Sequence, residues 1–167
     1  KQLKYKQRKV KFKKEKTMVE KVYHIGLTVS DLDNSIAFYK DILGLEFQGE
    51  ILMVGNETDR MFCRSNCKVR VAYLNGSKAV DAPPIELIQF IDSDISKVQS
   101  DLFKTSISEI CFYTDDIDFV YKKLKENNVE CLSAPQNFDF TADGFGKSRA
   151  FYFRDPDGII LEMMQPV

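Results

Sequence analysis

The sequence lacks the features that anchor a protein in a membrane or fit it to an oxidising compartment. No apolar run approaches the roughly 20 residues that cross a bilayer. The basic start is followed by no apolar core region, so we expect no signal peptide. Four cysteines lie at scattered positions, which does not indicate a disulfide framework. We therefore predict a cytoplasmic protein that has no membrane partner.

Histidine is also scarce, because His24 is the only one in the chain. Cys63 and Cys67 lie close together, but no second Cys/His pair accompanies them to complete a zinc knuckle. We interpret the two cysteines as ordinary thiols in a loop. A structural zinc site of the finger type is not indicated.

Charge is distributed unevenly along the chain. Residues 1–16 hold nine Lys/Arg and one Glu, whereas the remainder holds 15 basic and 24 acidic residues, a net charge of −9. An acidic body argues against nucleic acid as a partner. The basic segment alone could contact RNA or anionic lipid. We favour instead a basic N-terminal extension over residues 1–17, with Met18 as the natural start.

One plan of elements occurs twice. Residues 23–47 read as strand, turn, helix and turn, and residues 108–129 repeat this order, with Glu109 at the position of His24. The repeat predicts a first module over 18–91, a connector over 92–106 and a second module over 107–167. Three groups match in order, at offsets of 85, 79 and 76: Ile25 and Asp31–Asp33 with Ile110 and Asp116–Asp118, Arg70–Tyr73 with Arg149–Tyr152, and Ile85–Leu87 with Leu161–Met163.

Each module is predicted to run strand, helix and three strands, which makes the protein α+β. In the first module Asp31 or Ser30 caps the helix and Gly44 ends it. The first-module strands are predicted at 23–29, 45–54, 69–74 and 85–90, with a polar loop over 55–67. In the second module the strands are predicted at 109–113, 129–132, 149–153 and 159–164, with a helix from Asp115–Asp116 to Lys125 and a turn at 155–158.

Polar residues occupy matching positions in the two modules. Glu86 and Glu162 each interrupt an apolar strand, where a buried carboxylate needs a partner or a metal. His24 and Glu109 open equivalent strands. Each of these residues taken alone is explained as an ordinary strand residue, either buried with hydrogen-bond partners or exposed to water. Their joint placement predicts that the four side chains converge on one cavity if the modules are related by a pseudo-twofold.

The segments HIGLTVSDLDNSIAFYKDILGLEF, IEL, EICFYTDDID and FRDPDGIILE together resemble the vicinal oxygen chelate superfamily, over about residues 21–166. This superfamily includes glyoxalase I, methylmalonyl-CoA epimerase, extradiol dioxygenases, and fosfomycin and bleomycin resistance proteins. The resemblance implies paired βαβββ modules whose curled mixed sheets enclose a cavity. It also implies a divalent metal at four positions, here His24, Glu86, Glu109 and Glu162, and a homodimer.

Glu109 departs from the family pattern, since metal-binding relatives usually have His there. Three carboxylates around a dication favour a hard ion such as Mg²⁺ or Mn²⁺, and Zn²⁺ or Ni²⁺ stay open. Glu109 therefore marks either an unusual metal site or a lost one. The sequence does not decide whether the four residues come from one chain or from two.

The expected function is that of a lyase or isomerase of the glyoxalase I or epimerase type. Such an enzyme polarises a substrate carbonyl with its metal, and Glu162 or Glu86 takes the neighbouring proton. The substrate is a small molecule of undetermined identity. Lys147 and Arg149 are interpreted as solvated charges rather than as anion-binding groups.

Two other classes remain open and one is disfavoured. A metal-free, bleomycin resistance-like binding protein would use the same cavity, lined by Tyr113, Phe138 and Phe151. A thiol transferase of the fosfomycin type is a further alternative. A single histidine disfavours an extradiol dioxygenase, which holds Fe(II) with two His and one carboxylate.

Overall fold

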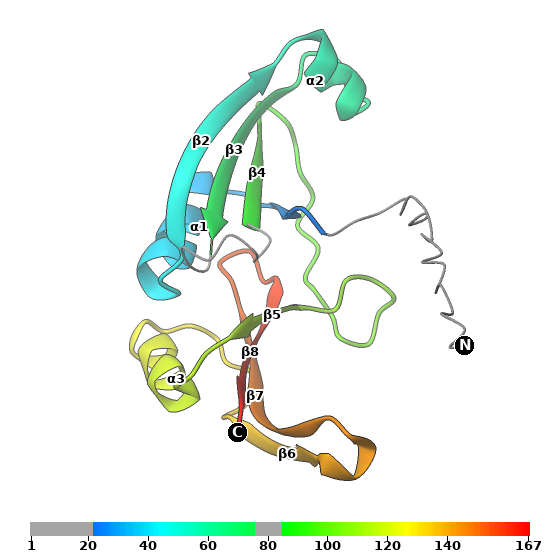
Figure 1. Ribbon diagram of the computed structural model, residues 1–167. Helices are drawn as coiled ribbons and strands as arrows, with labels where there is room; N and C mark the ends of the chain where they lie inside the picture. Colours follow the sequence, from blue (N-terminus) through cyan, green and yellow to red (C-terminus); the bar gives the residue numbers. More distant parts are fainter. Residues whose placement is uncertain (1–21, 76–84) are drawn as a thin grey trace, which may run out of the picture.

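The computed structural model describes residues 22–75 and 85–167, and these form two mixed four-stranded sheets (Figure 1). The strand orders are β1-β4-β3-β2 and β5-β8-β7-β6, so the second sheet repeats the topology of the first. In each sheet the first strand pairs in parallel with the last, and the other pairs are antiparallel. The α+β class and the two βαβββ modules are confirmed. The extension predicted over residues 1–17 lies outside the described residues.

The first module contains one helix more than the sequence predicted. Its elements are β1 (Ile25–Thr28), α1 (Leu32–Ala37), a π-helical turn η1 (Phe38–Ile42), β2 (Glu46–Val54), α2 (Asn56–Met61), β3 (Lys68–Asn75) and β4 (Ile85–Ile91). The segment 55–67 was predicted to be a polar loop, and the short helix α2 within it corrects that prediction. Six polar-rich residues form one and a half turns, which is too short for an apolar helical period to be visible in the sequence.

The second module follows the predicted order, with one strand displaced. Its elements are β5 (Ile110–Tyr113), α3 (Ile117–Glu126), β6 (Gln136–Phe140), a 3-10 turn η2 (Thr141–Asp143), β7 (Gly146–Arg154) and β8 (Ile160–Pro166). A strand was predicted over 129–132, but only a bridge between Cys131 and Phe153 forms there. The strand proper begins after Pro135. All five residues of β6 are exposed, so burial does not impose the apolar alternation from which strands are recognised.

Both main helices begin at the predicted caps. The Asp31 carboxylate accepts a 3.0 Å hydrogen bond from the Asn34 amide, and Asp116 does the same for the Phe119 amide at 3.0 Å. Gly44 follows the first helix at a φ of +80°, a conformation that favours glycine. Local sequence therefore determines where both helices begin and where the first one ends.

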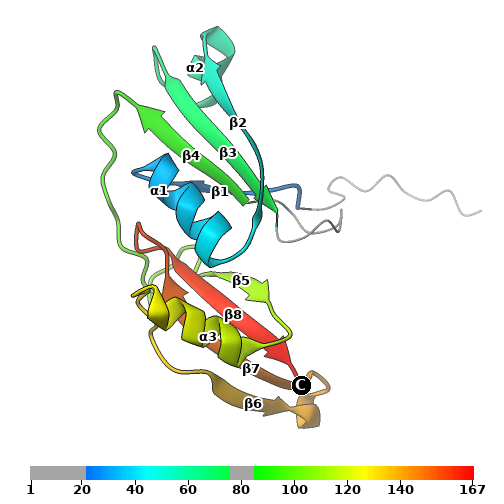
Figure 2. The ribbon, with the colours of Figure 1, turned by 90° about the vertical axis from the view of Figure 1, so that its left-hand side faces the viewer.

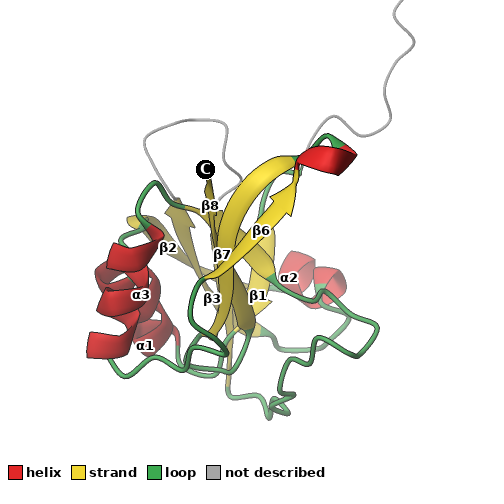
Figure 3. Cartoon of the chain, turned by 90° about the horizontal axis from the view of Figure 1, so that it is seen from below, coloured by secondary structure: helices red, strands yellow, loops and turns green. Residues whose placement is uncertain are grey.

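One continuous hydrophobic core joins the two modules. Helices α1 and α3 lie on the same side of the sheets (Figures 2 and 3), whereas α2 lies on the other side. The core contains the inward faces of both helices and one face of each sheet. Its fully or almost fully buried members from the two modules include Val29, Leu32, Tyr39, Leu74, Leu87, Ile117, Leu124, Phe151, Phe153 and Leu161. A smaller cluster around Val69 and Val71 covers part of the opposite face of the first sheet, under Phe62.

Polar contacts also join the modules at the turn before β8. The hydroxyl of Tyr39 donates to the buried Asp155 carboxylate at 3.1 Å. The amide and hydroxyl of Ser30 donate to Asp157 at 2.9 and 2.5 Å. Asp155 also accepts the amides of Asp157 and Ile159, which shapes the turn itself. This turn therefore links the end of β1 and the first helix to the last strand of the chain.

Candidate functional site

The candidate residues lie on the sheet face opposite to α1 and α3. Within β4, Ile85 and Leu87 point into the main core, so Glu86 between them points to the other face. Within β8, Leu161 and Met163 do the same and leave Glu162 on the other face. His24 and Glu109 directly precede β1 and β5. Strand alternation therefore gives all four residues equivalent positions in their modules.

In the first module Glu86 is held by two partners. Its Oε1 accepts a 2.7 Å hydrogen bond from the Tyr73 hydroxyl, and its Oε2 lies 3.0 Å from His24 Nε2. Tyr73 stands directly across from Glu86 in the antiparallel β3–β4 pair. Burial, followed by the hydrogen bond to Glu86, raises the pKa of Tyr73 to about 12, so its proton stays on the hydroxyl. The Glu86 side chain is 12% exposed and that of His24 is 39% exposed.

In the second module Glu162 has a different set of neighbours. Tyr152 stands across from it in the β7–β8 pair, as Tyr73 does for Glu86. Cys111 is its partner in the parallel β5–β8 pair. Burial raises the pKa of the Cys111 thiol to about 12, with further contributions from a hydrogen bond to Glu162 and the charges of Glu162 and Glu109. Burial and the same two carboxylates raise the pKa of Tyr152.

The two modules differ at one repeated position. Gly26 occupies in β1 the place that Cys111 occupies in β5, because each pairs with the glutamate of its module. A Cβ added at Gly26 would lie 3.4 Å from Glu86 Oε2 and 3.2 Å from Ile88 Cδ1. Glycine thus leaves room for the His24–Glu86 contact, whereas a thiol fills the corresponding space beside Glu162.

Within one chain the predicted ligands form two pairs rather than one cluster. Across residues 22–75 and 85–167, no group of three or more His, Cys, Asp and Glu side chains comes together in a way that could hold a metal ion. His24 and Glu86 are in contact, and Glu109 and Glu162 share the neighbours Cys111 and Tyr152. The strands that follow His24 and Glu109 belong to different sheets. The four candidate residues thus lie as two pairs, one in each module.

The other residues singled out in the sequence divide between surface and core. Tyr113 is 74% exposed, and Phe138 is 41% exposed and stacks on Phe140 with ring centres 5.8 Å apart. Phe151 was predicted to line the cavity, but it is 2% exposed and packs against Tyr121 in the core. This prediction was wrong because alternation in β7 turns Phe151 towards the helices and Tyr152 towards the candidate face.

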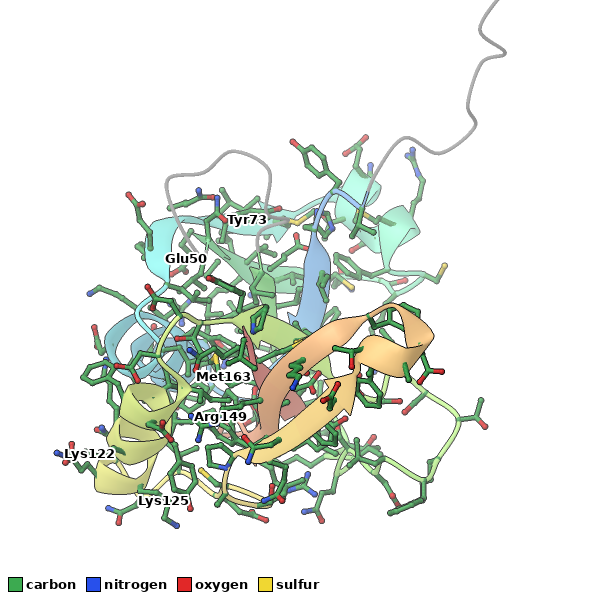
Figure 4. All side chains as sticks on the ribbon, turned by 60° about the horizontal axis from the view of Figure 1, so that its bottom comes forward. Glu50, Tyr73, Lys122, Lys125, Arg149 and Met163 are labelled. Atoms are coloured by element: carbon green, nitrogen blue, oxygen red, sulfur yellow. The ribbon has the colours of Figure 1, made fainter. Side chains whose placement is uncertain are left out.

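Arg149 and Lys147 have carboxylate partners of their own. Arg149, labelled in Figure 4, contacts Asp118 of α3 at 2.6 and 2.8 Å, and Lys147 lies 3.0 Å from Asp139. The interpretation of both as surface charges therefore agrees with their contacts. Arg70 forms the equivalent pair with Asp33 of the first module at 2.8 Å.

Three neighbours of the candidate residues were not recognised as such from the sequence. They are Tyr73, Tyr152 and Cys111. The signal was present, because Tyr73 and Tyr152 match in the repeat and Cys111 shares a strand face with Glu109. Their importance depends on cross-strand register, which the repeat alone does not reveal.

Relatives with similar sequences cover most of the chain. A metallothiol transferase, FosB of Staphylococcus epidermidis, is 31% identical over 148 residues, which cover 87% of this chain and 81% of FosB. The uncharacterized protein YaeR of Escherichia coli is 29% identical over 147 residues, which cover 88% of this chain and 97% of YaeR.

Among the described residues no helix has the length and apolar character that a membrane-spanning helix requires.

Solved structures agree on the fold at lower sequence identity. A glyoxalase family protein from Bacillus cereus has a TM-score of 0.75 and 19% identity, and the match covers 93% of this chain and 99% of that one. The trypanothione-dependent glyoxalase I of Leishmania major has a TM-score of 0.60 and 19% identity, with 88% and 87% covered. A family model also matches residues 21–163. The chain belongs to the Glyoxalase/Bleomycin resistance protein/Dioxygenase superfamily.

Proposed function

We propose that the protein is a divalent metal-dependent enzyme that abstracts a proton next to a substrate carbonyl, as glyoxalase I and the epimerase do. His24, Glu86, Glu109 and Glu162 would hold the metal. The observation that carries the proposal is the duplicated cross-strand pair on the candidate face, Tyr73 with Glu86 and Tyr152 with Glu162. In both modules this pair lies next to a strand that a second ligand-type residue directly precedes.

The donors fit a divalent cation by their chemistry. One imidazole nitrogen and three carboxylates suit a small, hard dication, and Mg²⁺ or Mn²⁺ suits them better than a thiophilic metal. In the single chain the His24–Glu86 contact of 3.0 Å satisfies both groups, which is the simplest structural role for this pair. Metal binding requires His24 Nε2 to carry no proton towards Glu86, so the imidazole must be neutral and present a lone pair to the ion.

The site is proposed to combine residues from two subunits of a homodimer. One chain holds its ligand-type residues in two pairs, and the second module's candidate face carries exposed Phe138 and Phe140. A second copy that brings its Glu109–Glu162 pair to the His24–Glu86 pair would complete the set. The same contact would cover these aromatic side chains, whose exposure is otherwise unfavourable.

Glu162 is the better candidate for the base. Both oxygens of Glu86 have partners, at 2.7 and 3.0 Å, whereas the neighbour of Glu162 is the Cys111 thiol, a weak donor that also lies 3.8 Å from the Phe112 carbonyl oxygen. A bound dication would polarise the substrate carbonyl and stabilise the negative charge that develops on it. Glu162 would take the proton from the neighbouring carbon and return it to the product. Tyr73 would keep the Glu86 carboxylate fixed during the reaction.

Thiol transfer is the second candidate function. Its support is the 31% identity to the FosB metallothiol transferase over most of both chains. Such a reaction needs the same metal site but no base that exchanges a carbon-bound proton. Proton exchange therefore separates the two functions.

The test uses wild type and the Glu162→Gln variant in deuterated water, each with added Mg²⁺ or Mn²⁺. We expect wild type to exchange the carbon-bound proton of a hemithioacetal or an acyl-CoA, and we expect the variant to be slower by about 10²-fold or more. If no proton exchanges and a thiol is consumed in the presence of fosfomycin, the transferase function is assigned. If neither activity is detected and no metal is bound, the protein is assigned as a metal-free binding protein.

Subunit mixing tests the arrangement of the site. A His24→Ala/Glu86→Gln variant and a Glu109→Gln/Glu162→Gln variant each lack one pair. If the site spans two chains, a mixed dimer contains one intact site, and unfolding and refolding the two variants together restores metal binding. If mixed dimers form and bind no metal, the two-subunit site is wrong.

A further inference from the structure

A cavity lies between the two modules, next to β5. Its volume is about 630 Å³, which is within the range of about 300–1,000 Å³ that is usual for small-molecule sites. The first module contributes the end of its helix and the starts of β1 and β4, and the second contributes β5 and α3. Its lining includes Ile42, Leu43, Ile110, Val120, Lys123 and Met163. Met163 is labelled in Figure 4.

The cavity interrupts the main hydrophobic core. Ile110, Leu124 and Met163 of its wall are buried members of that core, and Phe112 and Val120 pack against it. Protein interiors are close-packed and contain few voids larger than a water molecule. The aromatic side chains of Tyr113 and Phe119 line the cavity and are 74% and 62% exposed, so they mark its open side. A space of this size, with an apolar wall and an aromatic entrance, suits an apolar ligand.

One charged group faces this apolar space. Of the described residues that line the cavity, only Lys123 has a side chain that is charged at neutral pH. Lys123 is half-buried and has no ion-pair partner in the part of the chain that the structure describes. Its neighbours Lys122 and Lys125 are exposed and point away from the molecule (Figure 4). A half-buried lysine beside an apolar wall favours a ligand that has an anionic end.

We propose that this inter-module cavity binds a linear aliphatic carboxylate of medium length, with its chain among Ile42, Ile110 and Val120 and its carboxylate at Lys123. The proposal does not depend on the metal site, which uses the opposite face of the sheets. Cys111 and Tyr113 of β5 are the described lining residues that belong to that face. A ligand here would bridge both modules.

The test measures binding of decanoate and of decanol to the full chain by calorimetry. We expect wild type to bind both probes. Lys123→Met should weaken decanoate about tenfold or more and leave decanol unchanged, because only the carboxylate contacts the ammonium. Lys122→Met is the matched control, since Lys122 lies on the same helix, is exposed and pairs with Glu126 at 3.8 Å, and it should change neither affinity.

Two further variants test the apolar wall. Val120→Trp should fill the cavity and abolish binding of both probes, with its fold checked by circular dichroism. Phe119→Ala at the exposed entrance should not disturb folding and should weaken both probes. The proposal is overturned if wild type does not bind decanoate at about 1 mM. It is equally overturned if Lys122→Met weakens decanoate as much as Lys123→Met does, or if a folded Val120→Trp variant still binds.

Discussion

The hydroxyl of Tyr39 donates a 3.1 Å hydrogen bond to the carboxylate of Asp155, and this buried contact joins the first helix of one module to the last turn of the other. Burial raises the pKa values of both groups. The charge of Asp155 raises the pKa of Tyr39 further, whereas the hydrogen bond from Tyr39 lowers the pKa of Asp155. The two modules are therefore joined by a specific polar contact inside an otherwise apolar core. A loss of this contact should be measurable as a loss of stability of the whole chain.

Tyr39→Phe should lower the free energy of unfolding by about 1–2 kcal/mol, because a buried carboxylate loses one of its donors. Urea unfolding measures this change. Tyr121→Phe is the matched control, since Tyr121 packs against Phe151 through its ring and its hydroxyl has no hydrogen bond among the described residues. A Tyr39→Phe variant as stable as the Tyr121→Phe variant would show that the hydrogen bond does not couple the modules.

Asp157 should make stability depend on pH in the acid range. Burial alone would raise the pKa of its carboxyl, but the two donors of Ser30 and the ammonium of Lys97 outweigh burial, so the pKa lies below its ordinary value of 3.8. The resulting stabilisation of the folded state is present at pH values above the pKa of Asp157 in the unfolded chain. It is lost as the pH falls through the lower pKa that Asp157 has in the folded chain.

The measurement compares wild type with Asp157→Asn by urea unfolding from pH 7 downwards. The difference between the two free energies of unfolding should be largest at neutral pH and should shrink below about pH 4. A difference that stays constant or grows on acidification would mean that Asp157 does not contribute through its charge.

The repeated arginine pairs should differ in their effect on stability. Arg70 contacts Asp33, Glu50 and Gln89, whereas Asp118 is the one side chain to which Arg149 donates within the described part of the chain. Exposed single pairs contribute little because solvent screens them. Arg70→Met should therefore lower the urea midpoint more than Arg149→Met does. If Arg149→Met lowers the urea midpoint more than Arg70→Met does, the additional contacts of Arg70 do not determine the difference in stability.

Cys111 should be a slow nucleophile. Its pKa of about 12 leaves almost no thiolate at neutral pH, and the thiolate is the reactive form. Mass spectrometry after treatment with iodoacetamide at pH 8 should show Cys111 modified more slowly in wild type than in a Glu162→Gln variant, because that change removes one of the charges raising the pKa. Equal rates in the two proteins would argue against the thiol–carboxylate contact.

Much of the fold follows from short-range patterns. Alternation in residues 23–29 and 108–113, the caps Asp31 and Asp116, and the turn at 155–158 are local features that predict a strand–helix–strand order twice. The structure bears out that order. Helix α2 and strand β6 escaped prediction because neither buries a regular apolar face.

The candidate residues were recognised from the repeat, but their mutual arrangement was not. The positions of Glu86 and Glu162 in their strands determine which face of the sheet they occupy. The cross-strand register identifies their neighbours, which are Tyr73, Tyr152 and Cys111. Whether two pairs meet depends on how modules or subunits pack, and no local pattern encodes that. The inter-module cavity beside Lys123 is likewise a product of packing.

Metal content by elemental analysis tests the central claim most directly. Purified wild type is incubated with Mg²⁺, Mn²⁺, Ni²⁺ or Zn²⁺, dialysed, and compared with a Glu109→Gln/Glu162→Gln variant and with a Glu50→Gln/Asp118→Asn control, whose altered carboxylates contact Arg70 and Arg149 instead. We predict about one ion per subunit in wild type and control, and none in the first variant. Wild type that retains none of the four ions, or a Glu109→Gln/Glu162→Gln variant that retains as much metal as wild type, would contradict the proposed site.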